Sequence, residues 1–281
     1  MALSIIESRF LDEIHEKLDK DYNEFKYYQQ LVLDTLNAFH KICEKHNIDY
    51  YAAYGTLLGA IRDKGQIPWD YDVDVWVMHK EIERLMVALD KDLPNDYYYV
   101  TRYKDSNHRH FMMRITPKGF SSEVIHVDVF WLIDAPTRAD KLKRMVSLYN
   151  KRRALGIYKY LPVKILEYDQ NKFQRLYLRF KKMISGLLPA AYVDSFYYKA
   201  LNMAESDSNS FTDEYGVILK KEWFVQKHLL TFANGMQFYV PAGYLEILEE
   251  LYGNWQSYLD ISNRINEFQS SLQRIRAIGR E

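Results

Sequence analysis

The sequence predicts a mixed α/β fold, in which a small mixed sheet flanked by helices is followed by a mainly helical second region. Three observations support this prediction. Short strand patterns and helical patterns alternate over about the first 135 residues. Residues 137–207 then show helical spacing and many lysines and arginines. Asn234-Gly235 stands between two short apolar segments, which is a strong signal for a hairpin with a two-residue turn.

The first elements follow from the spacing of apolar residues. Between residues 10 and 46 these residues recur every three or four positions with charges between them, which predicts a long helix that Asn47 ends. A turn at Gly55-Thr56 comes soon after it. In order, we expect a strand at 49–53, a helical turn at 57–62, a strand at 72–78, a helix at 80–89, and strands at 97–103, 110–116 and 123–132.

The second half of the chain is predicted to be largely helical. From Arg175 to Leu188 the apolar residues form one stripe, and Lys181 and Lys182 lie off it. We expect the stripe to face the core and the basic side to face solvent, and a helix lying on a membrane surface is the alternative. Further on we expect a loop at 206–210, a hairpin of 229–233 and 236–240, a helix start at Pro241, and a helix at 244–252 ending at Gly253.

Composition argues against several classes of protein. Lys+Arg 38 and Asp+Glu 38 give a formal net charge of zero, whereas a nucleic-acid binder usually carries excess positive charge to neutralise phosphates. Cys43 is the only cysteine, so neither an intrachain disulfide nor a cysteine zinc site is expected. The N-terminus lacks a signal-peptide pattern, and no stretch of about 18 uncharged apolar residues exists. We therefore expect a cytoplasmic protein, with peripheral attachment to the membrane left open.

Three aspartates at alternate positions, Asp70, Asp72 and Asp74, are the most informative feature of the sequence. Alternate residues of an extended chain point to one side, so Asp72 and Asp74 should share a face. Two carboxylates about 4 Å apart repel each other by roughly 4 kcal/mol at an effective dielectric constant of about 20. A divalent cation with oxygen ligands relieves that repulsion. Because Val73 and Val75 fill the opposite face, a core strand with a metal site is favoured over a solvated acidic edge.

Two further features complete a candidate site. Asp128 projects from the strand predicted at 123–132, on the face opposite Val127 and Val129. The Gly55-Thr56 turn can bind phosphate through backbone N–H groups and the threonine hydroxyl. A phosphate site beside carboxylates that hold Mg²⁺ or Mn²⁺ is suited to displacement at phosphorus. One of the carboxylates could accept the proton of the attacking hydroxyl.

Two motifs resemble the signature of the LicD family, which includes the fukutin-related proteins and belongs to the nucleotidyltransferase superfamily. They are Gly-Thr-Leu-Leu-Gly-Ala-Ile-Arg, beginning at Gly55, and Ile-Pro-Trp-Asp-Tyr-Asp-Val-Asp, beginning at Ile67. The resemblance implies a nucleotidyltransferase-like fold. It also implies site residues: Asp72, Asp74 and Asp128 as catalytic residues, these three and Asp70 as metal ligands, and Gly55, Thr56, Arg62, Lys64 and Asp70 as residues that bind the donor.

The resemblance covers residues 40–132 well and residues 228–258 loosely. Tyr71 and Asn254 depart from it, because an aspartate is common in the family at both positions. We expect a catalytic domain with the N-terminal helix at 1–135. We also expect a mainly helical region with a hairpin at 136–281, which completes the cleft and the acceptor site.

The family resemblance implies metal-dependent transfer of a phosphoryl-linked group onto a hydroxyl of a cell-surface glycan such as lipopolysaccharide, teichoic acid or capsule. Phosphocholine from CDP-choline is the favoured cargo, and glycerol phosphate or ribitol phosphate from a CDP donor is the alternative. A lipid-linked acceptor would bring the protein to the inner membrane surface. A polynucleotide or antibiotic nucleotidyltransferase and a non-catalytic glycan- or lipid-surface binding protein are the competing interpretations, and the zero net charge disfavours a nucleic-acid partner.

Overall fold

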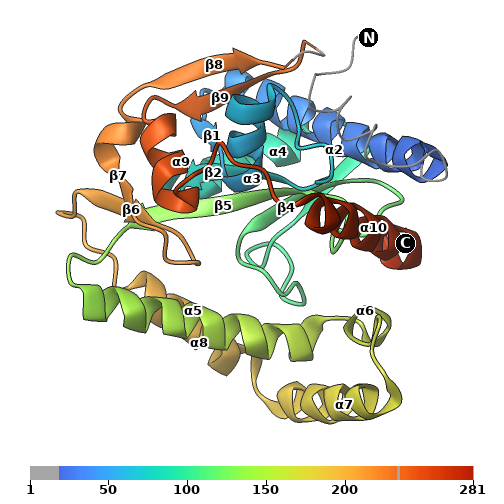
Figure 1. Cartoon of the computed structure of the whole chain (residues 1–281). Coiled ribbons are helices and arrows are strands. Elements are labelled where there is room, and N and C mark those ends of the chain that lie inside the picture. Colours follow the sequence, from blue (N-terminus) through green and yellow to red (C-terminus); the bar gives the residue numbers. More distant parts are fainter. Residues whose placement is uncertain (1–18, 233–234, 281) are drawn as a thin grey trace. The chain divides into compact units, whose positions relative to one another are not determined.

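The chain folds into two compact units. The computed structural model describes residues 19–232 and 235–280, so residues 10–18 of the first predicted helix lie outside the described part. Unit 1 comprises the described residues up to Tyr99, Arg114–Phe130 and those from Glu222 onward, and unit 2 comprises Val100–Met113 and Trp131–Lys221. Figure 1 shows a mixed architecture of helices and strands, which confirms the predicted fold class. Each unit contains more than one chain segment, whereas the predicted domains divide the chain once, at residue 135.

Unit 1 is built on a sheet whose strands have the spatial order β1-β2-β5-β4-β3. These strands are β1 Tyr50–Ala52, β2 Val73–Met78, β3 Tyr97–Val100, β4 Met113–Pro117 and β5 Val127–Asp134. β1 and β2 are antiparallel, with Tyr51 opposite Trp76. Because β2 and β5 are neighbours, the strand that carries Asp74 lies beside the strand that carries Asp128.

Helices and a hairpin complete unit 1. They are α2 Asp19–His46, α3 Tyr54–Leu58, the π-helical segment η2 Gly59–Asp63, the 3-10 segments η3 His79–Glu81 and η4 Lys221–Phe224, α4 Ile82–Asp92, α9 Tyr244–Tyr252, α10 Ile261–Ile278, and the strands β8 Lys227–Thr231 and β9 Gln237–Pro241. Phe25 of α2 packs edge-to-face on Phe268 of α10, with 5.0 Å between the ring centroids. The final helix, α10, is absent from the sequence prediction, although Phe268, Leu272 and Ile275 have helical spacing and are buried.

Some predicted bounds are wrong for local reasons. The strands expected at 97–103 and 110–116 are shorter, because the residues between β3 and β4 bond across turns, as Arg102 N does to His110 O at 2.7 Å. Pro241 closes β9 instead of opening a helix, and Ala242 N continues the pairing by donating to Gln226 O at 2.9 Å. The helical turn expected at 57–62 begins earlier, at Tyr54, and continues to Asp63 through the π-helical segment.

Unit 2 consists mainly of helices. They are α5 Ala139–Tyr160, α6 Val163–Leu166, α7 Lys172–Leu187 and α8 Ala190–Leu201. A buried cluster joins α5 and α8, and in it the rings of Phe111 and Tyr197 stack with centroids 3.6 Å apart. The loop expected at 206–210 ends where β6 Ser210–Thr212 begins, and β6 pairs with the end of β5 and with β7 Leu219–Lys220.

The orientation predicted for α7 is wrong. Its apolar stripe does not face a core, because Phe173 and Leu187 at its two ends are 87% and 80% exposed. The lysine side of the helix instead faces inward, where Lys182 Nζ donates to Leu161 O at 2.7 Å, just after the last turn of α5. Carbonyl groups at a helix end lack partners within the helix, so a lysine that satisfies them can determine which face of α7 is covered.

Candidate active site

The Gly55-Thr56 turn and the aspartate strand meet in unit 1. Thr56 Oγ1 accepts a hydrogen bond from the backbone N–H of Asp74 at 2.8 Å, which fixes the turn against the start of β2. A side chain at Gly55 would place its Cβ 3.2 Å from Asp70 Oδ2, so glycine allows this close approach. Asp70 Oδ1 also accepts from the backbone N–H of Asp72 at 3.0 Å. The structure therefore brings together the two motifs that the sequence places 14 to 19 residues apart.

Gln29 of α2 holds the loop that leads into this strand. It is a buried amide, and its Nε2 donates to Asp70 O at 2.6 Å and to Ile67 O at 3.1 Å. These bonds satisfy carbonyl groups in the segment between the π-helical turn and β2. Nothing in the local sequence pattern singles out Gln29, because its partners lie about 40 residues away.

The aspartates beside the Gly55-Thr56 turn have raised pKa values. Burial, followed by the charge of Asp128, raises the pKa of Asp74 well above its usual range. Burial and the neighbouring charge of Asp70 raise the pKa of Asp72 to about 7, although Asp72 keeps contact with solvent. Burial also raises the pKa of Asp70 to about 6. The charge of Asp128 on β5 thus raises the pKa of Asp74 on β2, within unit 1.

Asp128 differs from the other aspartates because it has a cationic partner. Arg114 of β4 is buried, and its Nε donates to Asp128 Oδ1 at 2.8 Å while its Nη1 donates to Glu123 Oε2 at 3.0 Å. His126 Nε2 lies 3.3 Å from the same oxygen of Asp128. Although burial opposes ionisation, Arg114 and His126 hold the pKa of Asp128 below its usual range, so it is a carboxylate.

Three residues near the site were not predicted from the sequence: Arg114, Glu123 and Tyr252. An arginine between Met113 and Ile115 on an apolar strand is the available signal, since a buried arginine requires anionic partners. Tyr252, in the last turn of α9, is also near the site: burial and the charges of Asp74 and Asp70 raise its pKa.

Arg62 and Lys64 lie on the π-helical segment and just after it. Arg62 Nε donates to Asp63 Oδ1 at 2.8 Å, and its guanidinium carbon lies 4.3 Å from the ring centroid of Tyr258. Lys64 is exposed and has a left-handed backbone, with φ of 58°. The structure thus gives Arg62 partners within the protein, and the binding of a donor diphosphate by either side chain stays a prediction.

The four aspartates have side chains that suit a divalent cation, but they are not assembled around one point. Within residues 19–232 and 235–280, no three His, Cys, Asp or Glu side chains are gathered closely enough to hold a metal ion. Asp70, Asp72, Asp74 and Asp128 nevertheless offer hard oxygen ligands. The charges of neighbouring aspartates add to the raised pKa values of Asp72 and Asp74, and a divalent cation relieves that kind of repulsion. The metal assignment accordingly stays a prediction.

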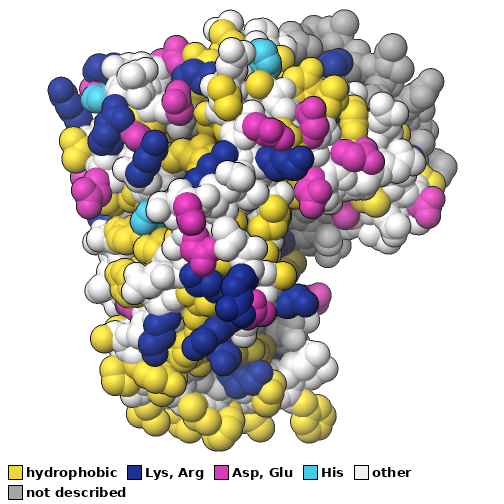
Figure 2. Space-filling view, turned by 90° about the vertical axis from the view of Figure 1, so that its left-hand side faces the viewer, with side chains coloured by type: hydrophobic (Ala, Val, Ile, Leu, Met, Phe, Trp, Pro, Cys, Tyr) yellow, Lys and Arg dark blue, Asp and Glu magenta, His cyan; other side chains and the backbone are white. Residues whose placement is uncertain are grey.

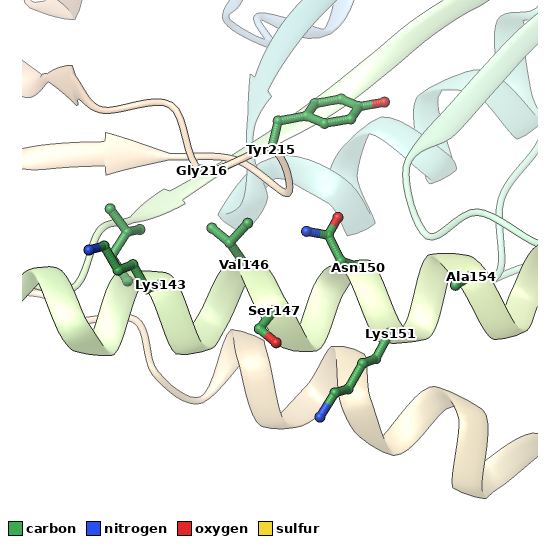
Figure 3. A pocket seen from close by; sticks show the side chains of 9 residues that line it. Lys143, Val146, Ser147, Asn150, Lys151, Ala154, Tyr215 and Gly216 are labelled. Atoms are coloured by element: carbon green, nitrogen blue, oxygen red, sulfur yellow. The ribbon is translucent and has the colours of Figure 1, made fainter.

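A separate cavity of about 620 Å³ lies in unit 2, between α5 and the loop at Tyr215-Gly216. Figure 3 shows Val146 and Asn150 pointing from α5 toward this loop. Lys143 and Lys151 line the cavity, and no carboxylate does. It therefore lacks the acidic groups that the predicted chemistry requires, and the candidate active site is the carboxylate cluster of unit 1.

Residues 47–154 match the family described as "LicD/FKTN/FKRP, nucleotidyltransferase domain". The matched stretch contains the Gly55-Thr56 turn, the alternating aspartates and Asp128. This stretch of the chain is therefore identified as a LicD-type nucleotidyltransferase domain. The chain is 29% identical over 246 residues to the lipopolysaccharide cholinephosphotransferase LicD of Haemophilus influenzae. This match covers 81% of this chain and 89% of that relative.

Two further relatives match over a short stretch only. The uncharacterized proteins RP689 of Rickettsia prowazekii and RT0683 of Rickettsia typhi are each 46% identical to this chain over 52 residues. Each match covers 18% of this chain, and 18% and 16% of the respective relatives. Similarity to the Haemophilus protein thus extends across most of the chain, whereas similarity to the rickettsial proteins is local.

Proposed function

We propose that this protein transfers phosphocholine from CDP-choline onto a hydroxyl group of lipopolysaccharide, with Mg²⁺ or Mn²⁺ at the carboxylate cluster of unit 1. The observation that carries the proposal is the bond from Asp74 N to Thr56 Oγ1, which fixes the phosphate-binding turn against the paired aspartates. The name of the Haemophilus relative, a lipopolysaccharide cholinephosphotransferase, supports this choice of cargo and acceptor. A cytidine nucleotide donor would place the reaction on the cytoplasmic side of the membrane.

Each residue has a defined part in the proposed reaction. Gly55 leaves room for the diphosphate beside Asp70, and Thr56 fixes Asp74 through its backbone. Arg114 and His126 keep Asp128 ionised and oriented. When bound, a divalent cation would neutralise charge on the phosphate oxygens. The acceptor oxygen forms a bond to the phosphorus of phosphocholine, the bond to CMP breaks, and one of the three catalytic carboxylates takes the hydroxyl proton.

CMP release tests the proposal. The protein is incubated with lipopolysaccharide lacking phosphocholine, Mg²⁺, and CDP-choline, CDP-glycerol or CDP-ribitol in turn. We expect CMP with CDP-choline and none after EDTA. If CMP is released with CDP-glycerol or CDP-ribitol but not with CDP-choline, the transferred group is glycerol phosphate or ribitol phosphate instead of phosphocholine. If the protein binds the acceptor but releases no CMP from any donor, the non-catalytic interpretation is favoured.

Asparagine variants test the carboxylates directly. Asp72→Asn and Asp74→Asn should each lower turnover by at least about 100-fold, because a neutral amide is a poor metal ligand and proton acceptor. Asp140→Asn is the matched control, since Asp140 is exposed on α5 and pairs with the equally exposed Arg138. Circular dichroism and thermal melting should show that all three variants fold. Full activity in either site variant would refute the assignment of that aspartate.

A further inference from the structure

The apolar side of α7 in unit 2 lies open to solvent. Phe173, Leu176 and Leu187 are 87%, 70% and 80% exposed. The same face carries other exposed large side chains: Tyr177, Phe180, Met183 and Ile184. Figure 2 shows hydrophobic side chains gathered at the end of unit 2 where Figure 1 places α7, with Lys and Arg side chains next to them. Contiguous apolar surface of this kind usually marks a place where something binds.

The opposite side of the helix is the one attached to the protein. Ser185 is buried, and Leu178 is half-buried. Lys181 Nζ donates to Tyr158 Oη at 3.2 Å, while Lys159 of α5 donates to Leu188 O at 2.7 Å. These bonds and those of Lys182 fix which face of α7 points outward. At about 100° per residue, the exposed apolar side chains occupy an arc of about 120° on that outer face.

Charge indicates what this face binds. α7 contains five basic residues, Lys172, Arg175, Arg179, Lys181 and Lys182, and no aspartate or glutamate. Lys172, Arg175 and Arg179 follow one edge of the apolar arc, and Lys181 lies beyond the other edge. Glu167, just before the helix, pairs with Arg179 and offsets one of these charges. An apolar face bordered by cations is typical of helices that lie at the boundary between headgroups and acyl chains.

We propose that α7 is a membrane-surface helix, which docks unit 2 onto a bilayer that contains anionic phospholipids. Its apolar residues would enter the outer part of the acyl region. Lys172, Arg175 and Arg179, along one edge of the apolar arc, would contact lipid phosphates. Within the part of the chain that the structure describes, no helix is long and apolar enough to cross a bilayer, so this contact is peripheral. A second copy of the chain is a poorer occupant, because it would bring an equally basic face against the first.

Vesicle flotation of the full chain tests the proposal. We expect binding to vesicles of phosphatidylcholine with about one third phosphatidylglycerol, and binding at least about tenfold weaker to phosphatidylcholine alone. The double variant Phe173→Gln/Leu187→Gln should bind the anionic vesicles at least about tenfold more weakly, because it removes the two most exposed apolar side chains of α7. The matched control is Val87→Gln/Val225→Gln, since these valines are 68% and 77% exposed and lie in unit 1.

The outcomes distinguish a membrane contact from a contact between two copies of the chain. No binding to anionic vesicles, or equal loss in the two double variants, would overturn the proposal. Sedimentation showing a dimer that the α7 variant dissociates, without vesicle binding, would assign the face to a second copy instead. CMP release with a water-soluble lipopolysaccharide fragment should be unchanged in the α7 variant, so loss of vesicle binding is measured independently of the proposed activity.

Discussion

β2 and α7 both carry a regular sequence pattern, yet the fold covers the apolar face in one and exposes it in the other. On β2 the alternating valines are covered, with Val73 and Val75 2% and 0% exposed, and the aspartates occupy the other face. On α7 the apolar stripe is outside, and Lys181 and Lys182 lie on the attached side. A period shows which residues share a face, but it does not show what covers that face.

The neighbours of each element explain the difference. β2 lies between β1 and β5 in the sheet, so the face that carries Val73 and Val75 is covered by the core. α7 contacts α5, and the bonds that join the two helices come from lysines to carbonyl and tyrosine oxygens. In the first region apolar burial determines orientation, and in the second polar bonds at helix ends do so.

The largest effect is expected where the carboxylate site depends on charge balance. Arg114→Met should destabilise the protein by about 3–5 kcal/mol, because it leaves Asp128 and Glu123 buried without their cation. Arg138→Met is the matched control, since the Arg138–Asp140 pair is 75% and 70% exposed and should contribute below about 1 kcal/mol. Urea unfolding measures both. Equal losses in the two variants would show that the Arg114 network is not a buried charge pair in solution.

This network marks the limit of what the sequence predicts about the site. The turn, the paired aspartates and Asp128 can be identified because a short motif and a period of two specify them locally. Arg114 reaches Asp128 and Glu123 through strand pairing, and α10 places Arg274 close enough to donate to Glu123 O at 3.2 Å. Such partners are chosen by register and packing, which no local pattern encodes.

A matched pair of leucines sharpens the comparison between covered and open faces. Leu85→Ala on α4 should cost about 2–5 kcal/mol, because Leu85 is 0% exposed and its loss leaves a cavity. Leu176→Ala on α7 should change stability by no more than about 0.5 kcal/mol, because Leu176 is 70% exposed. The free energies of unfolding in urea measure the difference. A cost above about 1 kcal/mol for Leu176→Ala would mean that another part of the protein covers α7 in solution.

For the fold, as for the site, the local elements can be predicted from the sequence, but the way they pack cannot. The helix over residues 172–187 follows from its period, and Asn171 and Gln174 form a capping box that sharpens its start. Its orientation depends on which donors reach the end of α5, more than 20 residues away in sequence. The hairpin of β8 and β9 is predictable because Asn234-Gly235 marks a turn between two apolar segments. The expected two-residue turn is wrong, however, because Thr231 pairs with Gln237 and Phe232 N donates to Met236 O at 2.9 Å, a register that a two-residue turn does not allow.

The smallest expected effect is a dependence of stability on pH that belongs to the carboxylate site. In the metal-free protein the pKa of Asp70 is raised to about 6 and that of Asp72 to about 7, above the 3.8 of an unperturbed aspartate. The folded protein therefore keeps protons that the unfolded chain releases, so the free energy of unfolding should fall as pH rises from about 4 to 7.

Because Asp72 is in contact with solvent, this fall is on the order of 1 kcal/mol. Melting in EDTA across that range measures it, and Asp72→Asn should flatten the upper part of the curve because it removes one titrating group. Phe173→Gln/Leu187→Gln is the control from the other region, since it changes no titratable group and should leave the pH dependence as in the wild type. A pH dependence that the Asp72 variant leaves intact would show that like-charge repulsion at this site is relieved within the protein itself, which would remove the electrostatic reason for a metal.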